Sequence, residues 1–358
     1  MASLINTRVL ILSDTHGDAL KRSVPTGADV AIHCGDLTEE SFLDEFAAAI
    51  QLLKGIDVPL KLVIAGNHDI TLDDRAFEHH LAEVGRSIDS ASLTKTYGKL
   101  GDARRLLESA DVRDAGIVYL SEDSHSFSLK NGASLTVYAS PYTASVSTGW
   151  GFTYAPGDQE HKWNIPEAVD IAITHGPAEG VLDYTDSRTR AGSKSLFAAI
   201  ARAKPRMHCF GHIHEAWGAK KVTWRSDLSD QPSHFTDIDQ DKSMLIESLA
   251  TLRMSKFDSE DDIARKASKR SKYEAQGSCN ASTEIRKGEQ TLFVNAAIQG
   301  AEEGDHLPWL VNLDLPKDRE NVESMERRRS SGSGAEDDVC KHQRIKTDTV
   351  EMGDRSEE

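Results

Sequence analysis

The sequence predicts an α/β protein in which helices cover mixed β-sheets. From residue 9 to about 120, short apolar and β-branched runs alternate with amphipathic helical patterns, which is typical of βαβ units. After residue 120, two alternating strand patterns flank the turn Asn131-Gly132 and predict a β-hairpin. Parallel units and a hairpin together favour a mixed sheet.

The first half of the chain is predicted to contain three buried strands, because each is a short continuous apolar run: Val9–Leu12, Val30–His33 and Leu62–Ala65. A helix is expected between the second and third strands. Thr38 is a suitable N-cap for this helix, and Gly55 is a suitable end. The apolar residues of the helix follow helical spacing: Phe42, Phe46, Ala49 and Leu53.

The second half of the chain adds strands to the same predicted core. We expect strands at Val169–Thr174 and Met207–Phe210, with a helix formed by SLFAAIARA between them. Apolar strands return at Thr291–Ile298 and Trp309–Pro316, where the core is expected to close. These patterns predict one folded domain made of residues 1–225 and 289–318.

Two segments lack the pattern of a packed core. Residues 226–288 are polar and charged, and we interpret them as an inserted segment that is partly helical. Its one predicted helix has Leu245, Leu249 and Leu252 on a shared face. Residues 319–358 are charged and rich in Ser and Gly, which predicts a disordered C-terminal tail.

Composition restricts the classes of partner. The chain has 58 acidic and 42 basic residues in 358, a formal charge of −16, so no duplex nucleic acid is expected to bind by charge. A small anion could bind if metal ions reverse the local sign. We find no export signal and no apolar stretch of about twenty residues, and therefore expect a cytoplasmic protein without a membrane segment. The four cysteines form no CxxC pair and are interpreted as reduced thiols.

Polar side chains follow five of the predicted strands, close to the point where each strand ends. Open α/β sheets bind ligands at the carboxyl ends of their strands, so these side chains are expected to meet there. The set comprises Asp14, His16, Asp36, Asn67, His68, Asp69, His175, His212 and His214.

Metal binding is the physical explanation that we favour for this set. Carboxylates and imidazoles crowded together would shift one another's protonation, and divalent cations that accept oxygen and nitrogen ligands remove this cost. Two Asp, one Asn and four His exceed what one ion takes from protein, so we expect two ions that share a carboxylate. Mixed oxygen and nitrogen donors favour Mn, Fe, Zn or Co over Ca or Mg, and of these we expect manganese, with iron, zinc or cobalt as alternatives.

The same residues resemble a known family. Asp14-x-His16, Gly35-Asp36, Gly66-Asn67-His68-Asp69, His175 and Gly211-His212-x-His214 are similar, in order, to the motif set of calcineurin-like metallophosphoesterases, from residue 9 to about 225. The stretches SPYT, WGF, THGPAEGVLD, GHIHEAWG and FVNAAI resemble the metallophosphoesterase-domain group that includes vertebrate brain-type phosphodiesterases. The resemblance implies a four-layer α/β/β/α sandwich with two mixed β-sheets.

The resemblance also implies a role for each residue. Asp14, His16 and His214 would hold one metal, Asn67, His175 and His212 would hold the other, and Asp36 would bridge the two. His68 would be catalytic and face the phosphate. The implied reaction is hydrolysis of a small phosphodiester or phosphomonoester, possibly a nucleotide, by a hydroxide that bridges the metals.

Some alternatives remain open. The protein could be a hydrolase recruited to a specialised metabolite, or a nucleotide-binding or scaffold protein with weak activity. Gly35-Asp36 is followed by LTEE and not by Val-Asp-Arg-Gly, so the partner that orients His68 in Ser/Thr protein phosphatases is absent at that position. Four aromatic residues near the motifs could line a substrate pocket or belong to the core: Tyr142, Trp150, Phe152 and Trp217.

Overall fold

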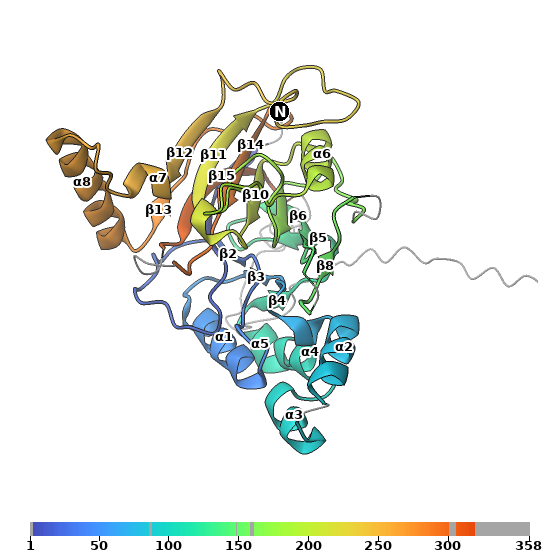
Figure 1. Ribbon diagram of the computed structural model, residues 1–358. Coiled ribbons are helices and arrows are strands. Elements are labelled where there is room, and N and C mark those ends of the chain that lie inside the picture. The colour runs from blue at the N-terminus through green and yellow to red at the C-terminus, as the bar shows by residue number, and fades with distance from the viewer. Residues whose placement is uncertain (1–2, 86–87, 148, 158–160, 301–305, 319–358) are drawn as a thin grey trace, which may run out of the picture.

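Two β-sheets form the centre of the protein (Figure 1). The computed structural model describes residues 3–85, 88–147, 149–157, 161–300 and 306–318. The first sheet has the order β13 (Cys279–Asn280), β15 (Trp309–Pro316), β1 (Leu4–Leu12), β2 (Val30–His33), β3 (Lys61–Val63), β4 (Ile117–Tyr119). Its strands are parallel except for the antiparallel pair of β1 and β15.

The second sheet is also mixed. Its order is β12 (Met244–Ser248), β11 (Gly218–Thr223), β14 (Gln290–Asn295), β10 (Met207–Phe210), β9 (Ile171–Thr174), β6 (Ser134–Ser140), β5 (Asp123–Ser128). The strands from β14 to β6 are parallel, whereas those at both edges are antiparallel. A separate parallel pair is formed by β7 (Thr143–Ala144) and β8 (Thr153–Tyr154).

Helices cover the outer faces of both sheets. The first sheet is covered by α1 (Leu43–Gly55), α4 (Asp102–Leu107) and α5 (Ala110–Asp114), and the second by α6 (Lys194–Ala203). The remaining helices are η1 (Ile70–Leu72), α2 (Asp74–Val84), α3 (Ser90–Tyr97), η2 (His214–Ala216), α7 (Leu249–Leu252) and α8 (Glu260–Gln276). The predicted four-layer α/β/β/α sandwich is therefore confirmed.

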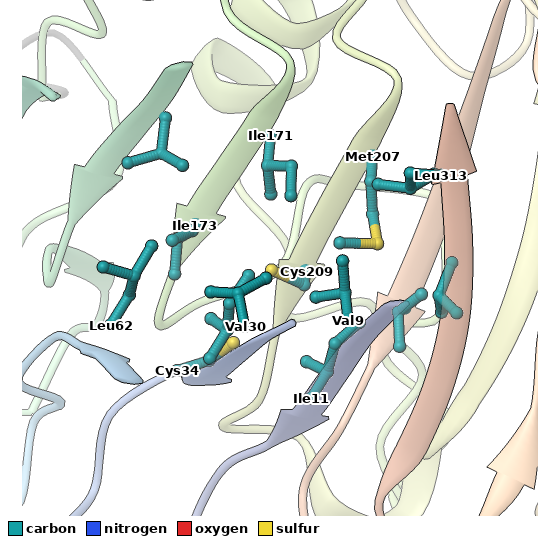
Figure 2. Packing of buried hydrophobic residues seen from close by; sticks show 14 of the residues in the cluster. Val9, Ile11, Val30, Cys34, Leu62, Ile171, Ile173, Met207, Cys209 and Leu313 are labelled. Carbon is teal, nitrogen blue, oxygen red and sulfur yellow. The ribbon is translucent and has the colours of Figure 1, made fainter. Parts of the chain in front are cut away.

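The alternation of side chains along β1 explains why two apolar layers form. Val9 and Ile11 point into the core between the sheets, where they meet residues such as Met207 of β10 (Figure 2). Leu10 and Leu12 point the other way and pack under α1. A strand with apolar residues at every position can therefore be buried on both faces.

Helix α1 begins later than the sequence predicted. Its N-cap is Phe42, whose backbone N–H donates to the carboxylate of Glu45 at 2.8 Å. Thr38, the expected N-cap, donates its hydroxyl to Oδ1 of Asp69 at 2.7 Å. The expectation was wrong because the hydroxyl of Thr38 donates its hydrogen bond to a buried carboxylate from another loop and not to the first turn of the helix.

The hairpin and the later strands agree with the sequence pattern. Strands β5 and β6 pair antiparallel, and Gly132 in their turn has φ of +88°, which a glycine adopts without a steric penalty. Strand β10 covers the predicted range, and α6 contains the SLFAAIARA segment.

The segment 226–288 contributes strands to both sheets. β12 pairs with β11 at one edge of the second sheet, and β13 pairs with β15 at the edge of the first. Leu245 lies in β12, so the expected helix through Leu245, Leu249 and Leu252 is wrong. Pairing of β12 with β11 outweighs the local helical spacing. The predicted tail, 319–358, lies outside the described residues.

No helix in the described part of the chain combines the length and the hydrophobicity that crossing a lipid bilayer requires.

A buried carboxylate connects β12 to α8. Glu247 is 1% exposed, and it accepts hydrogen bonds from Nζ of Lys269 at 2.8 Å and from the hydroxyl of Tyr273 at 2.9 Å. Burial alone would raise the pKa of Glu247, but the hydrogen bonds from Lys269, Thr251 and Tyr273 outweigh it and lower the pKa. Helix α8 is therefore attached to the sheet by a charged contact.

We expect Glu247→Ala to loosen α8 and to lower the free energy of unfolding by about 1–3 kcal/mol, because Lys269 and Tyr273 lose their shared acceptor. Hydrogen exchange of Glu260–Gln276 and urea unfolding measure the two effects. Lys272→Ala, at an exposed position of the same helix, is the control. Unchanged exchange in α8 would contradict the proposed attachment.

Candidate metal centre

The seven predicted ligands converge at the carboxyl ends of five strands. Two come after β1 and one each after β2 and β3, all in the first sheet; the other three follow β9 and β10 in the second sheet. The set is Asp14, His16, Asp36, Asn67, His175, His212 and His214. The centre therefore depends on both sheets and on their packing.

The first group of possible ligands contains Asp14, His16 and His214. Each offers one ligand atom, and these atoms lie within 4.8 Å of one another. Nε2 of His214 is 3.1 Å from Oδ1 of Asp14. The carboxylate of Asp14 also accepts the backbone N–H of His212, at 3.0 Å. Asp14 thus connects the loop after β1 to the loop after β10.

The second group contains Asp36, His175 and His212, whose ligand atoms also lie within 4.8 Å of one another. His175 donates its Nδ1–H to the carbonyl of Cys34 at 2.9 Å, which leaves Nε2 directed towards the other polar groups. This Nε2 is 2.9 Å from Oδ1 of Asn67 and 3.2 Å from Oδ2 of Asp36. The side chain of Asn67 therefore joins this group.

Asp36 belongs to more than one group of possible ligands. It lies with His175 and His212 in the second group, and with His16 and His68 in a third group of the same size. Oδ2 of Asp36 is 3.9 Å from Nε2 of His16 and 3.2 Å from Nε2 of His175. Its carboxylate therefore faces ligands of both of the predicted metals.

Four of these residues have a left-handed backbone. Their φ angles are 55°, 48°, 53° and 68°, for Asp14, His16, Asp36 and His212 respectively. This conformation costs a non-glycine residue roughly 1–2 kcal/mol. Backbone hydrogen bonds between the loops hold it, with N–H of Asp14 on the carbonyl of Gly35 at 2.9 Å and N–H of His16 on that of Asp36 at 3.1 Å. Strained backbone of this kind concentrates at functional sites.

The carboxylates and imidazoles strongly affect one another's protonation. Burial opposes ionisation of Asp14, but the hydrogen bond and charge of His214, together with the charges of His175 and His16, lower the pKa of Asp14 far below its usual range. Burial likewise opposes ionisation of Asp36, and His175 outweighs it, giving a pKa of about 2. Burial disfavours the charged form of His175, yet Asp36 raises the pKa of His175 to about 9. Both carboxylates are therefore anionic at neutral pH.

The residues fit divalent cations. Nε2 of His16 is buried and has no hydrogen-bond partner among the described residues. Burial, opposed by the neighbouring carboxylates, lowers the pKa of His16, so its ring favours the neutral form that binds metals. Burial is also the main cause that lowers the pKa of His212, to about 4. Neutral imidazoles next to two carboxylates form a donor set suited to Mn, Fe, Zn or Co.

Two glycines make room for the carboxylates. A Cβ atom on Gly66 would overlap Oδ1 of Asp36, and a Cβ atom on Gly211 would overlap Oδ2 of Asp14. Neither position can hold a larger residue without moving a carboxylate of the centre. The glycines of the GNHD and GHIH motifs are thus required because a carboxylate lies very close to the backbone at each position.

Glu39 is a functional candidate that the sequence analysis missed. Its carboxylate lies 2.7 Å from Nδ1 of His16, and its backbone carbonyl accepts Nδ1–H of His68 at 2.7 Å. Both contacts come from the LTEE segment, which stands where the Ser/Thr protein phosphatases have Val-Asp-Arg-Gly. A glutamate in a loop carries no periodic signal, so its contacts depend on the path of the loop. The carbonyl of Glu39 is the partner that orients His68.

Asp69 holds two loops of the centre together. Its buried carboxylate accepts from N–H of Gly66 at 2.8 Å, N–H of Leu37 at 3.1 Å, and both N–H and hydroxyl of Thr38. Burial, together with the charge of Asp36, raises the pKa of Asp69 to about 7 despite these hydrogen bonds. Asp69 therefore fixes the loop after β2 against the loop after β3.

Of the four aromatic candidates, Trp150 is the one beside His68. The two ring centroids are 4.3 Å apart, and Trp150 is 37% exposed. Tyr142 stacks on His161, with centroids 4.3 Å apart. Phe152 and Trp217 are buried in the core.

A family model for calcineurin-like phosphoesterases matches residues 7–216, which contain every residue of the centre. The chain belongs to the calcineurin-like phosphoesterase family. The matched range thus coincides with the part of the chain that forms the candidate metal centre.

The relatives of this chain include members of the metallophosphoesterase-domain group. Metallophosphoesterase domain-containing protein 1 of Homo sapiens and its Mus musculus counterpart are each 33% identical over 216 residues, 59% of this chain and 62% of theirs. A probable rhamnogalacturonate lyase C of Emericella nidulans is 32% identical over 217 residues, 61% of this chain and 18% of that protein. The chain thus spans less than two thirds of the length of these relatives. The resemblance to the metallophosphoesterase-domain group is confirmed.

We expect Gly211→Ala to displace Asp14 and to lower both the thermal stability and the metal content of the protein, because the added Cβ overlaps the carboxylate. Thermal unfolding and elemental analysis of the purified variant measure these effects. Gly55→Ala is the control, since nothing lies within 4 Å of a Cβ atom at the end of α1. A variant with normal stability and metal content would contradict the close approach at Gly211.

Proposed function

We propose that this protein hydrolyses a small phosphodiester or phosphomonoester, possibly a nucleotide, in a centre that holds two divalent ions. The observation that carries the proposal is the position of Asp36, whose carboxylate lies among possible ligands from both sheets. A carboxylate shared by two ions is the usual arrangement in two-metal hydrolytic sites. Manganese is the first candidate for both positions, with iron, zinc or cobalt as alternatives.

Each group of side chains would hold one ion. Asp14, His16 and His214 would hold the first, and Asn67, His175 and His212 the second, with Asp36 shared. When bound, such ions lower the pKa of a water molecule between them and neutralise charge on the phosphate oxygens. The chain supplies the orientation of these ligands through the contacts of Cys34, Glu39 and Asp69.

His68 would serve as the general acid. Its Nδ1–H is held by the carbonyl of Glu39, so its Nε2 is available to a substrate. As the oxygen of a hydroxide bonds to phosphorus, the bond from phosphorus to the leaving oxygen would break, and the proton on Nε2 of the protonated ring would pass to that oxygen and leave the ring neutral. The carbonyl of Glu39 fixes the direction of this transfer.

Trp150 supports a substrate with an aromatic or apolar part. Its partly exposed ring lies next to His68, where the leaving group or the group esterified to phosphate would lie. An indole face can stack on a nucleobase or on a nitrophenyl ring. This contact favours an organic phosphoester over inorganic polyphosphate.

We further propose a cytoplasmic location. Three cysteines in the described part of the chain, Cys34, Cys209 and Cys279, are buried free thiols. Thiols persist in the reducing cytosol, and disulfides are typical of exported proteins.

We expect His68→Ala and Asp36→Ala to separate catalysis from metal binding. With Mn²⁺ and bis-p-nitrophenyl phosphate, His68→Ala is expected to keep the metal content and to lose about 10²–10⁴-fold in kcat, the usual contribution of general acid catalysis. Asp36→Ala is expected to lose both metal and turnover. His79→Ala is the control, because His79 is exposed on α2.

Turnover by the wild-type protein below that of free Mn²⁺ would contradict the proposed hydrolysis and favour a binding or scaffold role. Two bound ions without turnover of any phosphoester in a panel of phosphorylated metabolites would instead favour a hydrolase recruited to another ester.

We expect Glu39→Ala to weaken metal binding about 10–100-fold, because the carboxylate that lies 2.7 Å from Nδ1 of His16 is lost. The backbone carbonyl remains and still holds His68, so kcat at saturating metal is expected to stay near the wild-type value. Titration of metal-free protein with Mn²⁺ and the kcat at saturation give the two quantities. Glu40→Ala is the neighbouring exposed control, and equal metal affinity in the two variants would rule out the role of Glu39.

A further inference from the structure

A cavity of about 230 Å³ lies between the segment 226–288 and the loop that follows β1. Residues of α7 and α8 line one side, and residues 20–22 line the other. All seven candidate ligands are in the described part of the chain, and none of them lines this cavity. The cavity is therefore separate from the metal centre.

Several apolar residues that line the cavity are well fixed. Trp217, Leu249, Leu252 and Leu307 are among them, and we call this apolar part of the lining the floor. Trp217 is 2% exposed, stacks on Trp309 with ring centroids 4.4 Å apart, and donates Nε1–H to the carbonyl of Leu307 at 3.0 Å. Such a floor can accept an apolar group without rearranging.

The charged residues that line the cavity, which we call its rim, are mostly basic. Among the described residues, four of them carry a cationic side chain, Lys21, Arg22, Arg253 and Arg270, and one carries a carboxylate, Glu274. This excess of positive charge occurs in a chain whose formal charge is −16. Among the described lining residues, cationic side chains thus outnumber carboxylates, which favours an anion at this place.

Two of the arginines differ in their contacts. Nη1 of Arg22 is 3.5 Å from Oε2 of Glu274, so this pair neutralises part of the rim. The guanidinium of Arg253 makes no hydrogen bond or ion pair with any other described residue. A planar guanidinium next to an apolar surface matches a carboxylate or phosphate group, to which it can donate two parallel hydrogen bonds.

We propose that this cavity binds a small organic anion, in which a carboxylate or phosphate group is attached to an apolar chain or ring. The apolar part would lie on Trp217 and Leu252, and the anionic group would face Arg253. The volume is below the about 300–1,000 Å³ of pockets for drug-sized ligands, so a smaller ligand is expected. The segment 226–288 thereby has a ligand-binding role that does not rest on the proposed hydrolysis.

Calorimetric titration of the full chain with octanoate, octyl phosphate and octanol, each below its micellar concentration, tests the proposal. We expect saturable binding of at least one of the two anions at one site per chain, with octanol at least about tenfold weaker because it lacks the charge. The tighter of the two anions identifies the preferred head group.

Variants locate the site. Arg253→Ala is expected to weaken binding about tenfold or more through loss of a charge-assisted hydrogen bond. Glu274→Gln is expected to tighten it, because Arg22 loses its competing carboxylate. Arg265→Ala is the matched control, since Arg265 lies on α8 but pairs with Asp262 and does not line the cavity. Asp36→Ala is expected to bind the anion with the wild-type affinity, because Asp36 does not line the cavity. This result would distinguish the cavity from the metal centre.

Absence of saturable binding by both anions would overturn the proposal, as would equal affinity for octanol. Unchanged affinity in Arg253→Ala, or loss of binding in Asp36→Ala, would mean that the anion binds elsewhere. Thermal unfolding of each variant establishes that it is folded before the titration.

Discussion

Two buried carboxylates with four histidines around them are the constraint on which the rest of this structure depends. Asp14 and Asp36 are almost fully buried, and among the described residues the positive charges that stabilise their ionised forms lie on neighbouring imidazoles. Divalent ions meet this requirement and leave the imidazoles neutral. The two sheets must pack closely for the ligands to meet, because neither sheet supplies the whole set.

The surrounding loops keep this arrangement at a cost in backbone energy. Four residues of the centre have left-handed φ angles, each costing roughly 1–2 kcal/mol. Hydrogen bonds to the carboxylate of Asp69 and the contacts of Glu39 hold these loops in place. Gly66 and Gly211 remove the atoms that would otherwise occupy the space of the carboxylates. The loops and glycines of the fold therefore hold the side chains of the centre in position.

Sequence patterns could predict the strands and the residues at their ends, because apolar runs mark buried strands and polar residues after them share one edge of the sheet. They could not predict contacts between loops distant in sequence. Thr38 has the chemistry of an N-cap, yet its hydroxyl binds Asp69. Leu245 has helical spacing, yet it lies in a strand that pairs with β11. Glu39 became visible only when the path of its loop placed it beside His16. Packing decides each of these cases.

The most direct test of the central claim is a crystal structure of the protein grown with Mn²⁺, with anomalous diffraction recorded at the manganese absorption edge. The account predicts two manganese peaks about 3.5–4 Å apart, with the carboxylate of Asp36 between them. One peak would be bonded to Asp14, His16 and His214, and the other to Asn67, His175 and His212. A single peak, or two peaks without Asp36 as a common ligand, would contradict it.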